Sequence, residues 1–502
     1  MSRGQSPDVV LVHPGSRTQV YQSLGNRLSA VEPPVWAGLM ATFLQQKGYG
    51  VEIIDADGEE LTAQQTAERV AHLDPLLTVL VVYGQQPSAS TQIMPAAGAI
   101  AAAIKANETH RKVLMVGGHV AALPERTLRE EAADFVCDGE GPYTILDLIE
   151  TLKSNQPDNY RAVRGLRYWH EGAIHRTPSA PLVNNVEAEM PKLAWDLLPM
   201  QQYRAHNWHC FGDLQRQPYA SIYTTLGCPF KCSFCCIQAP FKSGEQLLGM
   251  RAATNSYRFW GATAVIAQID HLVNKYNIRN IKIADEMFVL NARHIDGICN
   301  AIIERGYNLN IWAYARVDTV KDGMADKLKR AGFNWLAFGV ESGSERVRAQ
   351  VAKRFEQEQV YDTIGKVRAA GINVVANYIF GLPEDDQASM QETLDLALDL
   401  NCEWANFYSA MAYPGSQLYE EAVRNGWQLP ASWSGYSQHS VDTQPLPTNY
   451  VSAGEVLRFR DRAFNVYYSG QRYQDMVQRQ FGSDTLAHVN EMLSYKMERR
   501  FA

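Results

Sequence analysis

Residues 227–236 read Gly-Cys-Pro-Phe-Lys-Cys-Ser-Phe-Cys-Cys and decide how the rest of the chain is interpreted. Cys228, Cys232 and Cys235 have the spacing C-x3-C-x2-C, directly after an expected strand. Three thiolates on one tight loop can bind three irons of a [4Fe–4S] cluster and leave the fourth iron for a chelating ligand. A structural zinc site would need four protein ligands, and Cys236 could supply the fourth by count. Because adjacent cysteines seldom reach one ion, we expect an iron–sulfur cluster.

The cysteine loop stands in a long alternation of apolar runs and helical patterns. The expected strands are 221–225, 280–284, 310–315, 335–339, 373–380 and 405–410. The expected helices are 264–276, 291–305, 323–331, 344–352, 360–370 and 389–400. Six strand–helix units in series predict a (β/α)6 partial TIM barrel over residues 216–413, with the chemistry on the loops that come after the strands.

The first third of the chain shows the same alternation. Its expected strands are 8–13, 51–55, 76–83, 112–116 and 134–137. The pattern predicts a doubly wound, Rossmann-like α/β domain over residues 1–154. Ligands bind outside the carboxyl ends of such strands, and glycines follow three of them, at 84, 117–118 and 139–141. Any doubly wound domain also needs turn glycines, and the G-x-G-x-x-G fingerprint of a dinucleotide site is missing.

The remaining segments lack this alternation. Residues 155–215 are punctuated by prolines and predict an ordered connector, with a short hairpin of 165–169 against 173–176. Residues 414–502 begin with an aromatic-rich loop and continue with helical patterns. We therefore expect a mostly helical C-terminal region.

Composition and charge exclude several classes of protein. The chain has 502 residues, 46% of them hydrophobic and 20% charged, which is an ordinary globular balance. Its formal net charge of −7 argues against a protein that coats nucleic acid. No secretory signal and no apolar run of roughly 18–20 residues is visible, so we expect a cytoplasmic protein without a membrane span. Four of the eight cysteines lie within nine positions, which indicates metal or redox chemistry instead of a disulfide framework.

The cysteine loop resembles that of the radical S-adenosylmethionine (SAM) superfamily, in which an aromatic residue, here Phe234, precedes the last cysteine. The two-domain order resembles the cobalamin-binding (B12-dependent) subgroup, and within it the class B methyltransferase-like proteins. The motifs that carry the resemblance are Pro33-Pro34, Gly38-Leu39, 48–55, Gly117-Gly118-His119, 138–141, Asp285-Glu286 with Phe288, 316–318, 338–343, 380–384 and 413–416. Together they span roughly residues 8–430, and the cysteine loop is the most specific of them.

The resemblance implies three cofactors. Cys228, Cys232 and Cys235 hold a [4Fe–4S] cluster, and SAM chelates its fourth iron through the amino and carboxylate groups. One electron breaks SAM into methionine and a 5′-deoxyadenosyl radical, which takes a hydrogen atom from the substrate. In the cobalamin subgroup a second SAM methylates cobalamin, and the substrate radical takes the methyl group from methylcobalamin. We therefore expect a methyltransferase acting on an unactivated carbon, or a phosphinate phosphorus, of a small molecule, with flavodoxin or ferredoxin as electron donor.

The resemblance also implies roles for single residues around SAM. Glu341 fits the residue that contacts the ribose, with a surface acid near a helix N-terminus as the alternative. Arg316 fits a cation near the SAM carboxylate, with a salt bridge to Asp318 or Asp285 as the alternative. Asp285 and Glu286 are expected to contact the SAM amino group or the substrate. Gly381, with Glu384, matches the adenine-side segment, and a plain turn is the alternative.

Further residues are expected to bind cobalamin or to face the substrate. The expected cobalamin-binding residues are Gly84, Gln85, Ser88, Gly117, Gly118, His119, Gly139, Glu140 and Gly141. Tyr413 joins Asp285 and Glu286 as a candidate catalytic residue. The substrate wall is expected among Trp404, Phe407, Tyr408, Tyr413, Trp427, Trp433, Tyr436 and His439, although aromatic residues also dominate ordinary cores.

One cobalamin motif is not matched. Proteins that replace cobalamin's lower ligand use D-x-H-x-x-G in the first turn, but here Leu11 stands at the Asp position and Pro14 and Gly15 follow His13. His119 also lacks that frame. We therefore predict no bond from histidine to cobalt, and loss of cobalamin from the domain is the alternative.

Two other functions stay open at this stage. A cyclase or ring-rearranging enzyme of the same subgroup uses cobalamin without methyl transfer, and no motif separates it from a methyltransferase. A non-catalytic cobalamin or iron–sulfur sensor has no need of a SAM site, so Glu341, Arg316 and Asp285 together argue against it. The cysteines outside the loop motif are expected to be buried thiols: Cys137, Cys210, Cys236, Cys299 and Cys402.

Overall fold

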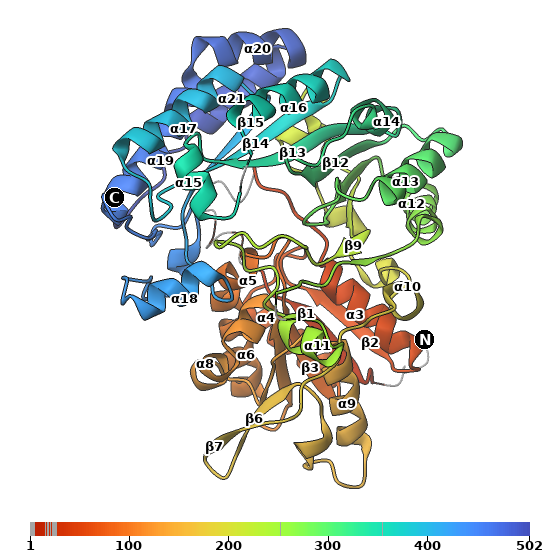
Figure 1. Ribbon diagram of the computed structural model, residues 1–502. Coiled ribbons are helices and arrows are strands. Elements are labelled where there is room, and N and C mark those ends of the chain that lie inside the picture. Colours follow the sequence, from red (N-terminus) through yellow and green to blue (C-terminus); the bar gives the residue numbers. More distant parts are fainter. Residues whose placement is uncertain are drawn as a thin grey trace.

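The computed structural model describes residues 6–15, 17, 20, 22, 28–251, 253–353 and 355–502. Two sheets built from successive parts of the chain face one another across a shared interface (Figure 1). The first sheet, in the red and orange part of the ribbon, has seven strands. The second, in the green and cyan part, has six.

The first sheet has the strand order β2-β1-β3-β4-β5-β6-β7. Its parallel strands are β1 (Val9–His13), β2 (Val51–Asp55), β3 (Leu77–Val82), β4 (Val113–Gly117) and β5 (Phe135–Cys137). Val9 and Leu11 of β1 point into one apolar cluster, whereas Val10 and Val12 point into another on the opposite face. Burial on both faces explains why the parallel strands are almost continuously apolar.

Helices cover both faces of this sheet. They are α3 (Val35–Gln46), α4 (Ala63–Leu73), α5 (Ala89–Gln92), α6 (Met94–Asn107), α7 (Gly118–Ala122), α8 (Pro124–Glu130) and α9 (Pro142–Lys153). Helices α3 and α9 pack together on one face, and α4 and α6 pack together on the other. The expected doubly wound α/β domain is confirmed in this arrangement.

The hairpin expected in the connector extends the first sheet. Strands β6 (Leu166–His170) and β7 (Ala173–Arg176) pair antiparallel, and β6 pairs antiparallel with β5. The pairing satisfies the backbone of β5, which would otherwise be an open edge. The rest of the connector holds helix α10 (Val186–Glu189) and the short 3-10 turns Tyr160–Ala162, Trp195–Leu197, Met200–Gln202 and Trp208–Cys210.

The second sheet is parallel throughout, and its strand order follows the chain. Its strands are β8 (Tyr219–Ile222), β11 (Asn280–Ile283), β12 (Asn310–Ala315), β13 (Phe333–Glu341), β14 (Asn373–Phe380) and β15 (Trp404–Ser409). The helices between them are α11 (Lys242–Leu247), α12 (Ala262–Tyr276), α13 (Ala292–Arg305), α14 (Met324–Arg330), α15 (Glu345–Gln350), α16 (Gln357–Ala369) and α17 (Gln387–Leu400). All six expected strand–helix units are present, and β8 and β15 form the two edges of an open sheet.

The first expected strand of this domain is divided. After β8 the chain bends and forms β9 (Thr225–Leu226), which pairs antiparallel with β10 (Arg258–Phe259). The bend is held by Asp285, which accepts hydrogen bonds from the backbone and the side chain of Thr224. The cysteine loop therefore begins from a fixed two-stranded base.

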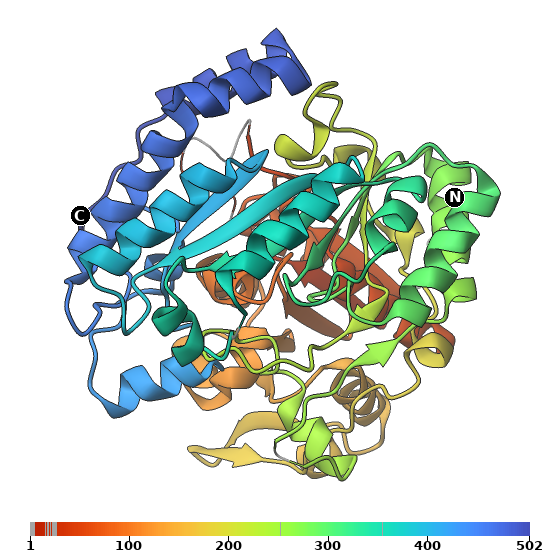
Figure 2. The ribbon, with the colours of Figure 1, turned by 45° about the horizontal axis from the view of Figure 1, so that its top comes forward.

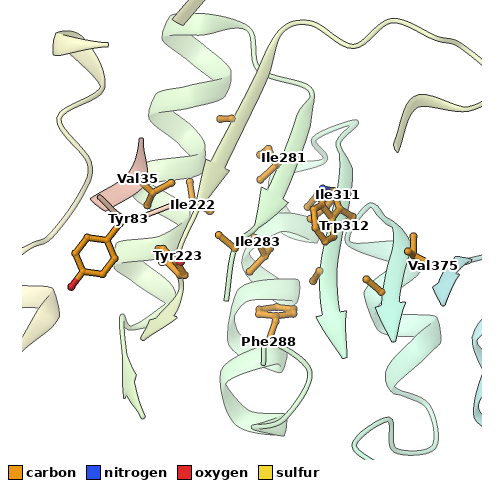
Figure 3. Packing of buried hydrophobic residues seen from close by; sticks show 14 of the residues in the cluster. Val35, Tyr83, Ile222, Tyr223, Ile281, Ile283, Phe288, Ile311, Trp312 and Val375 are labelled. Atoms are coloured by element: carbon orange, nitrogen blue, oxygen red, sulfur yellow. The ribbon is translucent and has the colours of Figure 1, made fainter. Parts of the chain in front are cut away.

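One apolar core runs through both domains. Val35 and Tyr83 of the first domain belong to the same cluster as Ile222 and Tyr223 of the second, and Figure 3 shows the four side chains together. The C-terminal helices are α18 (Gln417–Arg424), α19 (Ala453–Ser469), α20 (Gln471–Phe481) and α21 (Ser483–Ser494), and the segment between α18 and α19 includes a 3-10 turn at Trp433–Tyr436. Helix α19 packs on β15, at the blue and cyan side of the ribbon in Figure 2. Among the described residues, no helix is both long and apolar enough to cross a bilayer.

Candidate active site

The cysteine loop is held in place by its backbone. Gly227 has a φ of +89°, and a Cβ there would lie 2.3 Å from the carbonyl oxygen of Ser256. The carbonyl of Cys228 accepts hydrogen bonds from Gln238 Nε2 at 2.8 Å and Asn255 Nδ2 at 3.0 Å. Only glycine fits the first turn of the loop, and two amide side chains outside the cysteine motif fix the backbone at its first cysteine.

The three thiols of the motif share one electrostatic environment. Burial raises the pKa of the Cys228 thiol to about 11 and that of Cys235 well above its usual range, and the neighbouring thiols add to both effects. Within the described part of the chain, no three His, Cys, Asp or Glu side chains converge closely enough for a single metal ion. Each thiolate of a cluster binds its own iron, so a cluster does not require the three thiols to converge on one point.

Arg316 follows β12 and reaches the cysteine loop. Its guanidinium forms a two-point ion pair with Asp318, at 2.9 and 3.0 Å, and its Nη1 lies 3.8 Å from Cys232 Sγ. The guanidinium also lies over the ring of Phe230, 4.0 Å from its centroid. The salt bridge to Asp318 considered from the sequence is therefore present, and the arginine contacts the expected cluster loop as well.

Glu341 ends β13 in a strained conformation. Its φ is +66°, and the register against β14 shifts between Gly339 and Glu341. The side chain is buried and forms an ion pair with Lys353, whose Nζ also donates to the carbonyl of Gly339 at 3.0 Å. The alternative of a surface acid is therefore wrong. Strain of this kind concentrates where a side chain must be aimed at a ligand.

Asp285 holds the loop. Its carboxylate is fully buried and accepts hydrogen bonds from the Thr224 N–H and hydroxyl, both at 2.6 Å, and from the Thr225 hydroxyl at 2.9 Å. Burial raises the pKa of Asp285 to about 6, although these hydrogen bonds act in the opposite direction. The expectation that Asp285 contacts SAM or the substrate needs correction, because both carboxylate oxygens are occupied within the protein.

Glu286 is placed differently from its neighbour. Its Oε1 accepts a hydrogen bond from the Tyr223 hydroxyl at 3.3 Å, whereas its buried Oε2 has no partner among the described residues. Burial raises the pKa of Glu286 to about 8. Its side chain lines a narrow cavity that also borders Cys236 and Gly118. Of the two carboxylates, Glu286 is therefore the one open to a ligand.

Gly381 and Tyr413 shape the rim of the site. Gly381 has a φ of +83°, and its N–H and that of Leu382 donate to Asp385 Oδ2 at 2.9 and 3.1 Å. The Tyr413 hydroxyl accepts from Gln92 Nε2 at 3.3 Å and donates to the carbonyl of Tyr436 at 3.1 Å. Tyr413 thus links the first domain to the C-terminal region. Glu384 accepts a hydrogen bond from Asn449 at 2.8 Å at the surface, and Phe234 packs between two small apolar clusters.

Two cavities lie at the carboxyl edge of the first sheet. The switch-point cavity is next to β1 and β3, between which the strand order reverses, and the interdomain slot adjoins it. Trp36, Tyr83, Gly84 and Tyr223 line both cavities. Buried polar atoms without partners among the described residues face this region: His13 Nδ1 and Ser221 Oγ in the first cavity, and Glu286 Oε2 in the second. Such orphaned atoms at a switch point fit a large polar cofactor.

Some of the residues expected to bind cobalamin line these cavities. Gly84 lines both, Gln85 lines the switch-point cavity, and Gly118 lines the slot. Ser88 precedes helix α5 at the same edge. The ring of His119 is instead engaged by Thr91 Oγ1 at 3.1 Å and by the edge of Trp433, and burial lowers its pKa to about 3.

Other expected residues serve packing or domain contact. A Cβ on Gly117 would lie 2.1 Å from the carbonyl of Val82, and Gly141, with a φ of +117°, packs on Met40. Gly139 abuts Ser243 of the second domain. The Glu140 carboxylate binds Arg258 and the N–H of Val183, so its assignment to cobalamin needs correction.

A further cavity of about 220 Å³, the aromatic cavity, lies along the inner face of the second sheet. Its wall includes four of the eight residues expected to face the substrate: Trp404, Phe407, Tyr408 and His439. Tyr413, Trp427, Trp433 and Tyr436 do not line it. The lining residues that sequence analysis missed include Trp312 and Lys282, which lie within strands and belong to no motif.

Comparisons with known proteins agree with this arrangement. The radical SAM superfamily matches residues 222–397, and the B12 binding domain matches residues 22–149. An uncharacterized methyltransferase of Pyrococcus horikoshii is 28% identical over 461 residues, which are 92% of each chain. An anaerobic magnesium-protoporphyrin IX monomethyl ester cyclase of Cereibacter sphaeroides is 25% identical, covering 89% of this chain and 68% of its own.

A solved structure shows the same fold. The radical S-adenosylmethionine methyltransferase TsrM of Kitasatospora setae, with cobalamin and a [4Fe–4S] cluster bound, has a TM-score of 0.66 at 16% identity. The similarity covers 97% of this chain and 100% of that one. The expected order of the two α/β domains and the helical C-terminal region are thereby confirmed.

Proposed function

Because this chain belongs to the cobalamin-dependent radical SAM family, we propose that it is a methyltransferase that modifies an unactivated carbon, or a phosphinate phosphorus, of a small molecule. Its cofactors are a [4Fe–4S] cluster, SAM and cobalamin. The observation that carries the proposal is the interdomain slot, where Gly84 and Gly118 of the first domain face Glu286 and Cys236 of the second.

The cofactors supply chemistry that amino acids lack: when bound, the cluster would provide an electron for reductive cleavage of SAM, and cobalamin would carry the methyl group. The protein contributes binding and orientation. Cys228, Cys232 and Cys235 would hold the cluster, and Gln238 and Asn255 fix the backbone of their loop. The bond from Arg316 to Cys232 adds a positive charge beside a ligand thiolate.

The residues after the strands would orient SAM. Glu341 would accept the ribose hydroxyls, with Lys353 fixing its carboxylate. Glu286 would accept a hydrogen bond from the SAM amino group, since its Oε2 has no partner among the described residues. The turn at Gly381 would border the adenine, and Phe234 would pack beneath the loop.

The first domain would hold cobalamin at the switch point. Gly84, Gln85 and Gly118 would border the corrin ring. Ser88, which precedes helix α5, would lie near its rim. The predicted absence of a bond from histidine to cobalt stays a prediction: His119 is engaged elsewhere, whereas His13 lines the switch-point cavity. The apolar core that joins the domains would limit the access of water to the bound cofactors.

Isotope labelling tests the proposal. Anaerobically purified protein, with iron and corrinoid content verified by absorbance, is incubated with reductant, candidate small molecules and SAM carrying a labelled methyl group. The proposal predicts labelled product together with 5′-deoxyadenosine. Product without label, formed with 5′-deoxyadenosine, would instead indicate a cyclase or ring-rearranging enzyme, which the relative from Cereibacter sphaeroides keeps as the second candidate. A sensor would form no 5′-deoxyadenosine.

We also propose the partners and the location. All eight cysteines are free thiols, which suits a reducing compartment such as the cytoplasm. An electron donor such as flavodoxin or ferredoxin would approach at the cysteine loop, where Lys231 is exposed. Replacing Lys231 with Glu would then slow reduction of the cluster by an acidic donor, but not by dithionite.

A further inference from the structure

The aromatic cavity lies along the strands that lead to the proposed SAM residues. Lys282, Tyr314 and Asn377 line the cavity. They precede Glu286, Arg316 and Gly381 by four, two and four residues. Because β11 ends at Ile283, β12 at Ala315 and β14 at Phe380, the proposed SAM residues follow the carboxyl ends of strands whose inner residues line the cavity.

Charged side chains in the cavity wall are already paired. Lys282 Nζ binds both oxygens of Glu32, at 3.1 and 2.8 Å, and His206 binds the same carboxylate at 3.2 Å. Arg460 donates to the carbonyl of Phe407 and to Asp461, both at 2.7 Å. No cation of the described lining is therefore left for a phosphate or carboxylate, which proteins bind with unpaired Arg or Lys.

The amides that β14 and β15 contribute to the wall are also committed to the protein. Trp404 Nε1 donates to Asn406 Oδ1 at 2.9 Å, and Asn406 Nδ2 donates to Asn377 Oδ1 at 2.9 Å. Asn377 Nδ2 in turn donates to the carbonyl of Phe338 at 3.1 Å. This chain of hydrogen bonds joins β14 and β15, so these two strands offer the cavity mainly the ring faces of Trp404, Phe407 and Tyr408.

Trp312 is the exception in this wall. Its side chain is 2% exposed and lies against the rings of Trp208 and Tyr314, yet its Nε1 has no hydrogen-bond partner among the described residues. Figure 3 shows Trp312 on strand β12 beside the packed core. A buried indole N–H normally finds an acceptor, so the structure points to one supplied by a ligand.

We propose that the aromatic cavity binds an uncharged, planar aromatic or conjugated substrate, and that Trp312 Nε1 donates a hydrogen bond to an oxygen or nitrogen atom of that substrate. The inference rests on the proposed function, because it names the substrate class of the same site. Phosphorylated and other anionic substrates are rejected, since their charge would lose its hydration without gaining a cation. The inference therefore keeps the carbon substrate of the proposed function and drops its phosphinate alternative, because a phosphinate is an anion.

A matched pair of probes tests the substrate class. Binding of 2-naphthol and of 2-naphthyl phosphate to the anaerobic holoenzyme is measured by equilibrium dialysis. The inference predicts that 2-naphthol binds at least tenfold more tightly than its phosphate ester. Equal or tighter binding of 2-naphthyl phosphate would overturn it.

The role of Trp312 is tested with the same probe. Trp312→Phe keeps an aromatic ring and removes the N–H, so the affinity for 2-naphthol is expected to fall about fivefold. Trp433→Phe is the matched control, because Trp433 lies outside the cavity against His119, and its effect is expected to stay below twofold. An unchanged affinity in Trp312→Phe would overturn the assignment.

Two further measurements keep the outcome decisive. If Trp312→Phe fails to fold, Ala337→Val narrows the cavity from the neighbouring strand β13, and it is expected to weaken 2-naphthol binding at least fivefold. Corrinoid content and 5′-deoxyadenosine formation are measured on the same wild-type preparation. If the preparation binds no corrinoid or forms no 5′-deoxyadenosine while it still prefers 2-naphthol, the proposed function is wrong and the cavity assignment stands. If it forms 5′-deoxyadenosine but does not prefer 2-naphthol, the cavity assignment alone is overturned.

Discussion

Glu140 of the first domain and Arg258 of the second form a buried, two-point ion pair. The distances are 2.7 Å from Nη2 to Oε1 and 3.2 Å from Nη1 to Oε2, and the two side chains are 1% and 7% exposed. Arg258 belongs to β10, which pairs with the strand that leads into the cysteine loop. The ion pair therefore links the glycine turn of the B12-binding domain to the base of the expected cluster loop.

Breaking this pair should destabilise the protein strongly. Glu140→Gln leaves Arg258 buried without a counter-charge, and we expect the free energy of unfolding in urea to fall by about 3 kcal/mol. Glu304→Gln on the exposed surface of α13 is the control, with no expected change. The double variant Glu140→Leu/Arg258→Met, which removes both charges, should recover most of the loss. Equal stability of Glu140→Gln and the wild type would contradict this role.

The conformation of the turn at Gly227 leads us to expect that a side chain there prevents cluster binding. Gly227→Ala brings a Cβ within 2.3 Å of a carbonyl oxygen and should abolish the cluster, measured as iron and sulfide per chain. Gly249→Ala is the matched control: its φ of +69° is also positive, but no heavy atom would lie within 4 Å of the new Cβ. We expect this control to keep its iron, so loss of iron from both variants would point to backbone conformation instead of the contact with Ser256.

Asp385 predicts a dependence of stability on pH. Burial raises its pKa from 3.8 to about 6, so the unfolded carboxyl ionises at a lower pH than the folded one. The folded state then holds more protons between about pH 4 and 6, and stability falls as the pH rises through this window, by up to about 3 kcal/mol. Asp385→Asn should make that decline in urea-unfolding curves shallower by the share of Asp385, while Asp285, whose pKa burial also raises to about 6, keeps its own share.

The neighbouring Asp386 is the control for this measurement. The N–H of Ser389 donates to its carboxylate and holds its pKa below the usual 3.8, so its contribution is lost as the pH falls below about 4. Asp386→Asn should therefore leave the decline between pH 4 and 6 in place. A decline as steep in Asp385→Asn as in the wild type would refute the assignment.

Glu341 makes a prediction about SAM affinity. Glu341→Gln keeps the shape but removes the charge that would accept two ribose hydroxyls, so the Kd for SAM of the cluster-loaded protein should rise at least tenfold. Glu345→Gln, on the exposed first turn of α15, is the control and should leave the Kd unchanged. A Kd for Glu341→Gln within twofold of the wild type would rule out the ribose contact.

The sequence was a good guide to the fold because buried parallel strands leave a local signal. The apolar runs at β3 and β14 are buried along nearly their whole length, and each was predicted close to its observed bounds. The edge pairing of β6 with β5 was missed, since the hairpin's own pattern does not say which edge it joins.

The site was predicted less completely because burial and pairing depend on residues far apart in the chain. Glu140 stands 118 positions before Arg258, and Asp285 stands 61 positions after Thr224. Glu286 differs from these two carboxylates because its Oε2 has no hydrogen-bond partner among the described residues. No local sequence pattern reveals whether a carboxylate will be paired in the fold. Trp312 and Lys353 likewise became candidates only when the fold placed them beside the site.

The central claim is that three thiolates hold a cluster at which SAM is cleaved. Its most direct test is 5′-deoxyadenosine formed per chain, under anaerobic and reducing conditions, by the wild type and by Cys228→Ala, Cys232→Ala and Cys235→Ala. The account predicts formation by the wild type and none above background by each variant. Turnover that survives any of the three substitutions, or its absence from wild-type protein with a full cluster, would contradict it.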